Sequence, residues 1–154
     1  MRGLLRALTS PSPPPDHSRV LRIRTDQIAT LASSRAATFR QSMLRHLRTH
    51  FPAATASFDD HQLEALVSTT IARARRYDLV SEADVCRFLN LAATFGWEFD
   101  GDTECAWMQA MLTDPEISAP GDRLRLLVDE SVRRLRVHEH NARLRAAFAH
   151  RSGG

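Results

Sequence analysis

The stretch that decides the fold is SEADVCRFLNLAATFG, which spans residues 81–96. Ser81 and Asp84 stand three positions apart, the spacing of a capping pair at the start of a helix. Apolar residues then recur every three or four positions, as one face of a helix requires. Gly96 follows the last of them and supplies a left-handed exit. The stretch therefore predicts an amphipathic helix.

The same signals on either side predict four more helices. Asp59 and Gln62 form a second capping pair, and Val80 stands where it can pack on Val85 as a hydrophobic staple. Pro52 ends the first helix. The predicted helices span residues 25–50, 59–77, 81–96, 103–113 and 120–150.

No stretch is typical of a sheet, and no internal repeat is present, so we expect an all-α fold. At 154 residues the chain is long enough for one core. We predict a compact bundle of about five helices, with the apolar stripe of the first helix running from Ile28 and Leu31 to Leu47. The core should come from the helices predicted over residues 25–50, 59–77, 81–96 and 120–150.

The two ends of the chain differ in composition from the predicted bundle. Residues 1–19 are rich in proline and arginine and predict a disordered leader. Residues 20–24 alternate apolar and basic side chains, which indicates a short extended segment at the start of a helical domain over residues 20–150. Residues 151–154 predict a disordered tail.

The basic character of the chain is confined to its N-terminus. Residues 1–24 contain five arginines and one acidic residue, whereas residues 25–154 contain 16 arginines and 17 acidic residues. The chain has no lysine, which we attribute to a GC-rich coding sequence rather than to phosphate recognition. A nearly neutral helical domain argues against nucleic acid as a partner, although a nucleic-acid-binding helical regulator remains an alternative.

Patterns of catalysis, metal binding or membrane insertion are missing from the sequence. No glycine-rich phosphate loop or membrane-length apolar run occurs. His46 and His50 have a spacing that can serve one metal, but a third ligand is not evident. Cys86 and Cys105 fit apolar helical patterns as reduced, buried thiols. We therefore expect no enzyme activity, no cofactor and no metal.

The most unusual local feature is a cluster of aromatic residues among acidic ones. Trp97 and Phe99 follow Gly96 and lie between acidic residues, and these two side chains fit a core role and an interface role equally well. The residues expected to contact a partner are Trp97, Phe99, Asp100, Trp107 and Arg87.

Four short motifs form a spaced pattern within residues 74–112: Arg76-Tyr77, Asp84-Val85-Cys86-Arg87-Phe88, Phe95-Gly96 and Phe99-Asp100. Through these motifs the region resembles a group of small helical bacterial proteins from type VI secretion effector cassettes, which lie beside genes for spike and PAAR-type tip proteins. The likeness extends more weakly over residues 22–136. It departs from the family pattern at Asp78, where glycine is usual, and at Ala106, where proline usually precedes the tryptophan.

This resemblance implies a cytoplasmic accessory protein. Its partner would be a secreted effector or a spike or tip protein, and its role that of an adaptor or chaperone. An immunity protein of the same cassette is the alternative. Because the sequence has no membrane-length apolar run, we also expect no membrane association; the oligomeric state is left open.

Overall fold

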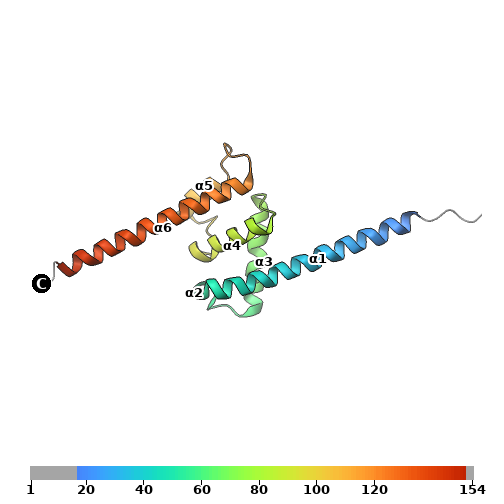
Figure 1. Cartoon of the computed structure of the whole chain (residues 1–154), viewed down its shortest axis with the longest axis horizontal. Helices are drawn as coiled ribbons and strands as arrows, with labels where there is room; N and C mark the ends of the chain where they lie inside the picture. The colour runs from blue at the N-terminus through green and yellow to red at the C-terminus, as the bar shows by residue number, and fades with distance from the viewer. Residues whose placement is uncertain (1–16, 152–154) are drawn as a thin grey trace, which may run out of the picture. The chain divides into compact units, whose positions relative to one another are not determined.

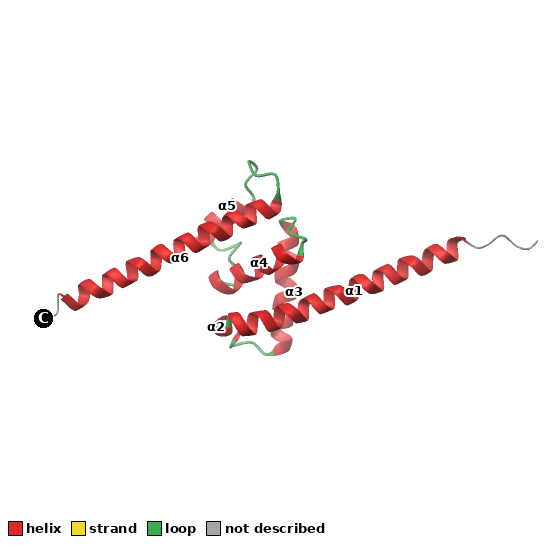
Figure 2. Ribbon diagram, in the orientation of Figure 1, coloured by secondary structure: helices red, strands yellow, loops and turns green. Residues whose placement is uncertain are grey.

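The computed structural model describes the backbone of residues 17–151 and the side chains of residues 24–147, and over this range the fold is all-α (Figures 1 and 2). No strand occurs between residues 17 and 151. The elements in chain order are α1 (His17–His50), α2 (Pro52–Thr55), α3 (Asp60–Arg76), α4 (Glu82–Phe95), the 3-10 turn η1 (Thr103–Cys105), α5 (Ala106–Leu112) and α6 (Pro120–Arg151).

The five predicted helices are confirmed as α1, α3, α4, α5 and α6, and the short helix α2 is additional. The N-terminal boundary was predicted wrongly. Residues 20–24 were expected to be extended, but α1 already begins at His17. The rest of the predicted leader, residues 1–16, lies outside the described residues, and so does the tail from residue 152.

The chain divides into two units, residues 1–37 and residues 38–154. In the first unit, the side chains of residues 24–37 are all exposed. The expectation that Ile28 and Leu31 belong to the core is therefore wrong, since these side chains are 67% and 66% exposed. In α1, side chains pack against the core only from Phe39 onward.

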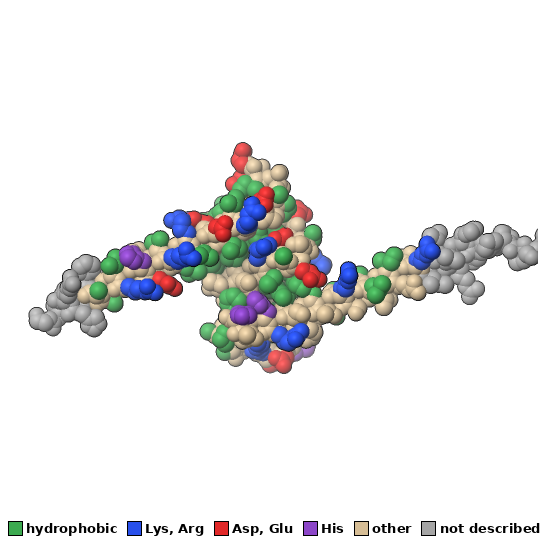
Figure 3. Space-filling view, in the orientation of Figure 1, with side chains coloured by type: hydrophobic (Ala, Val, Ile, Leu, Met, Phe, Trp, Pro, Cys, Tyr) green, Lys and Arg blue, Asp and Glu red, His purple; other side chains and the backbone are tan. Residues whose placement is uncertain are grey.

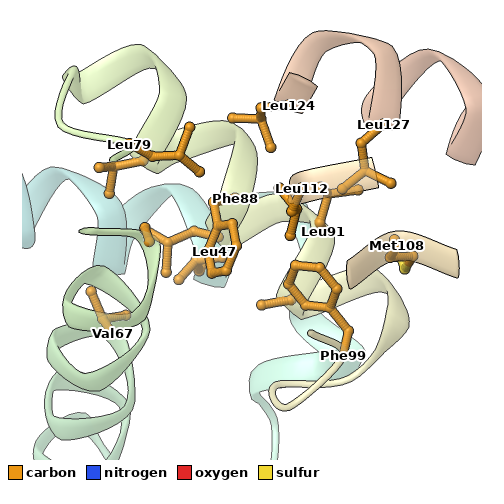
Figure 4. Close-up of a cluster of buried hydrophobic side chains, with 14 of the residues drawn as sticks. Leu47, Val67, Leu79, Phe88, Leu91, Phe99, Met108, Leu112, Leu124 and Leu127 are labelled. Atoms are coloured by element: carbon orange, nitrogen blue, oxygen red, sulfur yellow. The ribbon is translucent and has the colours of Figure 1, made fainter. Parts of the chain in front are cut away.

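The second unit contains the hydrophobic core. Helix α4 packs on both α3 and α6, and α5 packs on α6. Unlike the prediction, the core includes α5, which contributes Met108 and Leu112. Figure 4 shows these side chains together with Phe88 of α4 and Leu127 of α6. The buried hydrophobic side chains are Leu47, Leu63, Val67, Ala74, Leu79, Val85, Phe88, Leu89, Leu91, Ala92, Phe99, Met108, Leu112, Leu124 and Leu127.

Local signals fix both ends of α4. The Ser81 hydroxyl accepts a hydrogen bond from the Asp84 backbone N–H at 3.1 Å and donates to the Asp84 carboxylate at 2.6 Å. Gly96 ends the helix with φ of +113°, which confirms the prediction that this glycine terminates it. The predicted staple is wrong, however, because Val80 is 79% exposed and does not cover Val85.

Helix α3 ends in a Schellman motif. The Leu79 N–H donates to the Ala74 carbonyl, and the Asp78 N–H donates to the Arg75 carbonyl. This geometry places Asp78 at φ of +59°, in the left-handed region that favours glycine. Asp78 therefore occupies a position where glycine would adopt the backbone conformation without steric cost.

Candidate functional site

The loop from Gly96 to Asp102, here called the knuckle, is held in place by one buried arginine. Arg73 of α3 donates hydrogen bonds to the Trp97 backbone carbonyl and to the Asp100 carboxylate. It also forms an ion pair with Glu98 at 2.8 Å. Both partners in the Arg73–Asp100 pair are nearly fully buried. Removing one of them would leave the other charge buried without its partner.

Tyr77 completes the same network from the end of α3. Its hydroxyl donates to the second Asp100 carboxylate oxygen at 3.1 Å. Burial and the neighbouring Asp100 charge raise the pKa of Tyr77 to about 12, so the hydroxyl remains protonated as the donor this hydrogen bond needs. Asp100 is thus engaged on both oxygens.

The aromatic residues of the knuckle pack inward as well. Phe99 is only 1% exposed, and its ring centroid lies 5.0 Å from that of Phe88. Trp97 is half-buried and meets the Phe58 ring edge-on, at a centroid distance of 6.3 Å. Phe99 and Asp100, both expected to contact a partner, therefore point into the interior and leave almost no side-chain surface for one. Trp97 retains only a partly exposed edge.

Trp107 and Arg87, the two remaining residues expected to contact a partner, line two different grooves beside α6. The first, here called the α5–α6 groove, has a volume of about 470 Å³ and contains Trp107. The Arg134 guanidinium carbon lies 3.9 Å from the Trp107 ring centroid, in a cation–π contact. The groove is lined by Trp107, Met111, Leu126, Asp129, Glu130, Arg133 and Arg134.

Three charged side chains of the α5–α6 groove, Glu130, Arg133 and Arg134, pair with one another. Glu130 accepts hydrogen bonds at 2.7 Å from both Arg133 and Arg134. These bonds lower the pKa of Glu130 to about 2, so it stays ionised. Arg134 is thereby held between Glu130 and Trp107, which leaves the groove's aromatic side chain covered by a neighbour in the same chain.

The second groove, here called the α4–α6 groove, has a volume of about 160 Å³ and contains Arg87. Arg87 stands on its rim and pairs with Asp84 at 2.9 Å. Asn90, also in the lining, hydrogen-bonds to His46 at 2.9 Å. The rest of the lining is apolar or small, with Leu91, Thr94 and Phe95 from α4 and Val128, Ser131, Val132 and Leu135 from α6.

The apolar lining of the α4–α6 groove continues onto exposed turns of α6. Every side chain from residue 132 to residue 147 is exposed. Val132 and Leu135, which line the groove, are 41% and 40% exposed. Figure 3 shows basic side chains spread along this part of the helix, with hydrophobic ones between them. Leu124 and Leu127 are buried, and Val128 and Leu135 follow at helical spacing, so the apolar stripe of α6 runs from the core out onto this surface.

Among residues 17–151, the structure places no set of three histidine, cysteine or acidic side chains where they could hold a metal. His46 and His50 do lie close together, with ring centroids 4.7 Å apart. Both cysteines are free thiols, and burial raises the pKa of each. A raised pKa lowers the fraction of reactive thiolate at neutral pH.

None of the helices in the described part of the chain is long and apolar enough to cross a membrane. Comparison of the chain with protein-family models, with curated proteins and with solved structures finds no match.

Proposed function

We propose that this protein is a non-enzymatic protein-binding module, acting as an adaptor or chaperone for a type VI secretion effector or spike component. The resemblance of residues 74–112 to accessory proteins of such cassettes supports the choice of partner. A role of this kind is exercised in the cytoplasm, before the partner is secreted.

The α4–α6 groove is the observation that carries the binding role. It is a concave, mainly apolar surface between two helices, with Arg87 on its rim. Amphipathic partner segments typically dock by placing apolar side chains into such a groove. Leu135 is 40% exposed there, so a partner that covers it would remove apolar surface from water.

The knuckle supports this role indirectly. Arg73 ties the loop after α4 to α3, and Phe99 packs on Phe88 in the middle of α4. These contacts hold α4, and therefore one wall of the groove, in a fixed position. A rigid groove binds with a smaller loss of conformational freedom than a mobile one.

The test is co-expression of the full chain with each protein encoded in the same gene cluster, followed by purification of complexes. We expect one effector or spike protein to co-purify in a defined stoichiometry. Val132→Glu combined with Leu135→Glu should abolish this complex, because two carboxylates would enter the apolar lining. Val80→Glu, at an exposed apolar residue outside the groove, is the matched control and should leave the complex intact.

Two results would change the assignment. A complex that survives the groove double variant would move the binding site elsewhere on the molecule. If the co-purifying protein is a toxin and its activity is blocked in the complex, the module acts as an immunity protein. Failure of every protein of the cluster to bind would contradict the proposed function.

A further inference from the structure

The exposed turns of α6, residues 132–147 and here called the α6 extension, combine apolar side chains with an excess of positive charge. They contain five arginines and a single acidic residue, Glu139; Arg133 and Arg134 pair with Glu130, just before this segment, and Arg143 pairs with Glu139. Four apolar side chains, Val132, Leu135, Val137 and Leu144, are between 40% and 49% exposed. A solvated helical surface normally carries charges of both signs and few exposed large apolar side chains.

The arrangement of these residues extends the α4–α6 groove. Val128, Val132 and Leu135 line the groove at helical spacing, and Ala142 and Ala146 continue the same face. Arg136 and Arg143 follow Val132 by four and eleven positions, which places them within about 40° of it around the helix. Glu139 lies on this face as well and pairs with Arg143 at 3.7 Å. A mainly apolar strip, with two arginines along its edge and one ion-paired carboxylate within it, therefore leads out of the groove.

We infer that the segment bound along the α6 extension is an acidic amphipathic helix. This inference rests on the proposed function, since it names the chemistry of the partner at that site. The apolar face of such a helix would cover Val132 and Leu135, and its carboxylates would meet Arg136 and Arg143. Opposite charges at the edge of an apolar contact speed the encounter and set its register.

The same residues fit two other anionic partners less well. Duplex nucleic acid uses arginines on phosphates but leaves exposed apolar side chains such as Leu135 in water. Residues 132–147 also contain no phenylalanine, tyrosine or tryptophan on which single-stranded bases could stack. A membrane surface needs one apolar face, but Leu135 and Leu144 are nine residues apart and lie on roughly opposite sides of the helix.

The inference is tested by fluorescence anisotropy with the full chain and labelled model peptides. The first peptide is about 20 residues long, with leucine at every third or fourth position and glutamate elsewhere. The second has lysine in place of each glutamate, and the third is the first in scrambled order. We expect the acidic amphipathic peptide to bind at least ~10-fold more tightly than either of the others.

Charge reversal on the protein makes the test specific. Arg136→Glu with Arg143→Glu should weaken binding of the acidic peptide at least ~10-fold and strengthen binding of the lysine peptide. Arg24→Glu with Arg75→Glu changes the net charge equally at exposed positions outside α6. This control should change the affinity by no more than about twofold.

Three outcomes would overturn the inference. One is equal binding of the acidic and lysine peptides. Another is an equal loss of affinity for the acidic peptide in the charge-reversed variant and in its control. The third is tighter binding of a duplex DNA of about 20 base pairs, or of vesicles of anionic phospholipid, than of the acidic peptide. The proposed function would survive any of these if the co-purified complex still depends on Val132 and Leu135, so the two failures are distinguishable.

Discussion

The knuckle and the α6 extension are both rich in charged and apolar side chains, yet the structure uses them in opposite ways. In the knuckle, Asp100 faces the buried Arg73, and Phe99 lies in the core. In the α6 extension, the arginines outnumber the acidic residues and the apolar side chains remain exposed. Aromatic and acidic residues close together in sequence can thus serve the fold. An excess of arginine beside exposed apolar side chains is the reason why we propose the α6 extension, and not the knuckle, as the binding surface.

The largest expected effect is that of removing the knuckle's buried aromatic side chain. Phe99→Ala should lower the free energy of unfolding by about 3–5 kcal/mol, because it leaves a cavity beside Phe88. Chemical denaturation measures the loss. Trp97→Ala, at a half-buried position, should lower the free energy of unfolding by less than Phe99→Ala does. A Phe99→Ala protein as stable as wild type would break the comparison, since it would show that the ring is not part of the core.

Arg73→Leu should have the next largest effect, a loss of about 3 kcal/mol, because Asp100 would remain buried without its ion-pair partner. Adding Asp100→Asn removes that unpaired charge and should restore about 1 kcal/mol. Denaturant unfolding of Arg73→Leu, Asp100→Asn and the double variant gives the coupling free energy between the two side chains. Strictly additive losses would mean that the two side chains stabilise the protein independently, contrary to this account.

Tyr77→Phe tests the knuckle network through the pH dependence of the free energy of unfolding. At neutral pH it should cost about 1 kcal/mol, for the lost hydrogen bond to Asp100. The folded-state pKa of Tyr77 is raised to about 12, above its ordinary value of 10.0. Stability contributed by the protonated hydroxyl is therefore fully present below pH 10 and lost as the pH rises toward 12.

Thermal melts from pH 8 to about 12 should show this alkaline loss in wild type and a smaller one in Tyr77→Phe. Parallel curves for the two proteins would mean that the hydroxyl does not bind Asp100 in solution.

The smallest effect is expected at Asp78, next to the network. Asp78→Gly should raise stability by up to about 1 kcal/mol, because glycine adopts a positive φ without steric cost. Asp78→Ala is the control and should be about 1 kcal/mol less stable than the glycine variant, since its Cβ is strained there. Equal stabilities of the two variants would argue against the left-handed conformation.

The helices were predictable from sequence because their signals are local. Ser81 and Asp59 cap helices within three residues of themselves, and Gly96 ends one directly. The role of Arg73 could not be predicted from the sequence, because its partner Asp100 is 27 positions away in the chain. One clue was present, since Arg73 falls three residues after the buried Thr70 on the same helical face.

The candidate site was predictable only in part. Arg87 and Trp107 do line grooves beside α6, but different ones. The aromatic spacing of Trp97 and Phe99 did not reveal whether the side chains point inward, since both directions are compatible with a loop after Gly96. Leu135 stands on the apolar stripe of α6, seven residues after Val128. Its exposure depends on where the neighbouring helix α4 ends, and the stripe alone does not contain that information.

The most direct test of the contrast between the knuckle and the α6 extension is amide hydrogen exchange of the full chain, with and without the acidic amphipathic peptide. We expect the backbone amides of Phe99 and Gly101 to exchange slowly in both samples, because their N–H groups donate to the Gly96 and Glu98 carbonyls within a loop that the buried network holds in place. Residues 132–147 should exchange fast in the free protein and slow markedly when the peptide is bound. Protection that appears in residues 96–102 on binding, with residues 132–147 unchanged, would contradict the account.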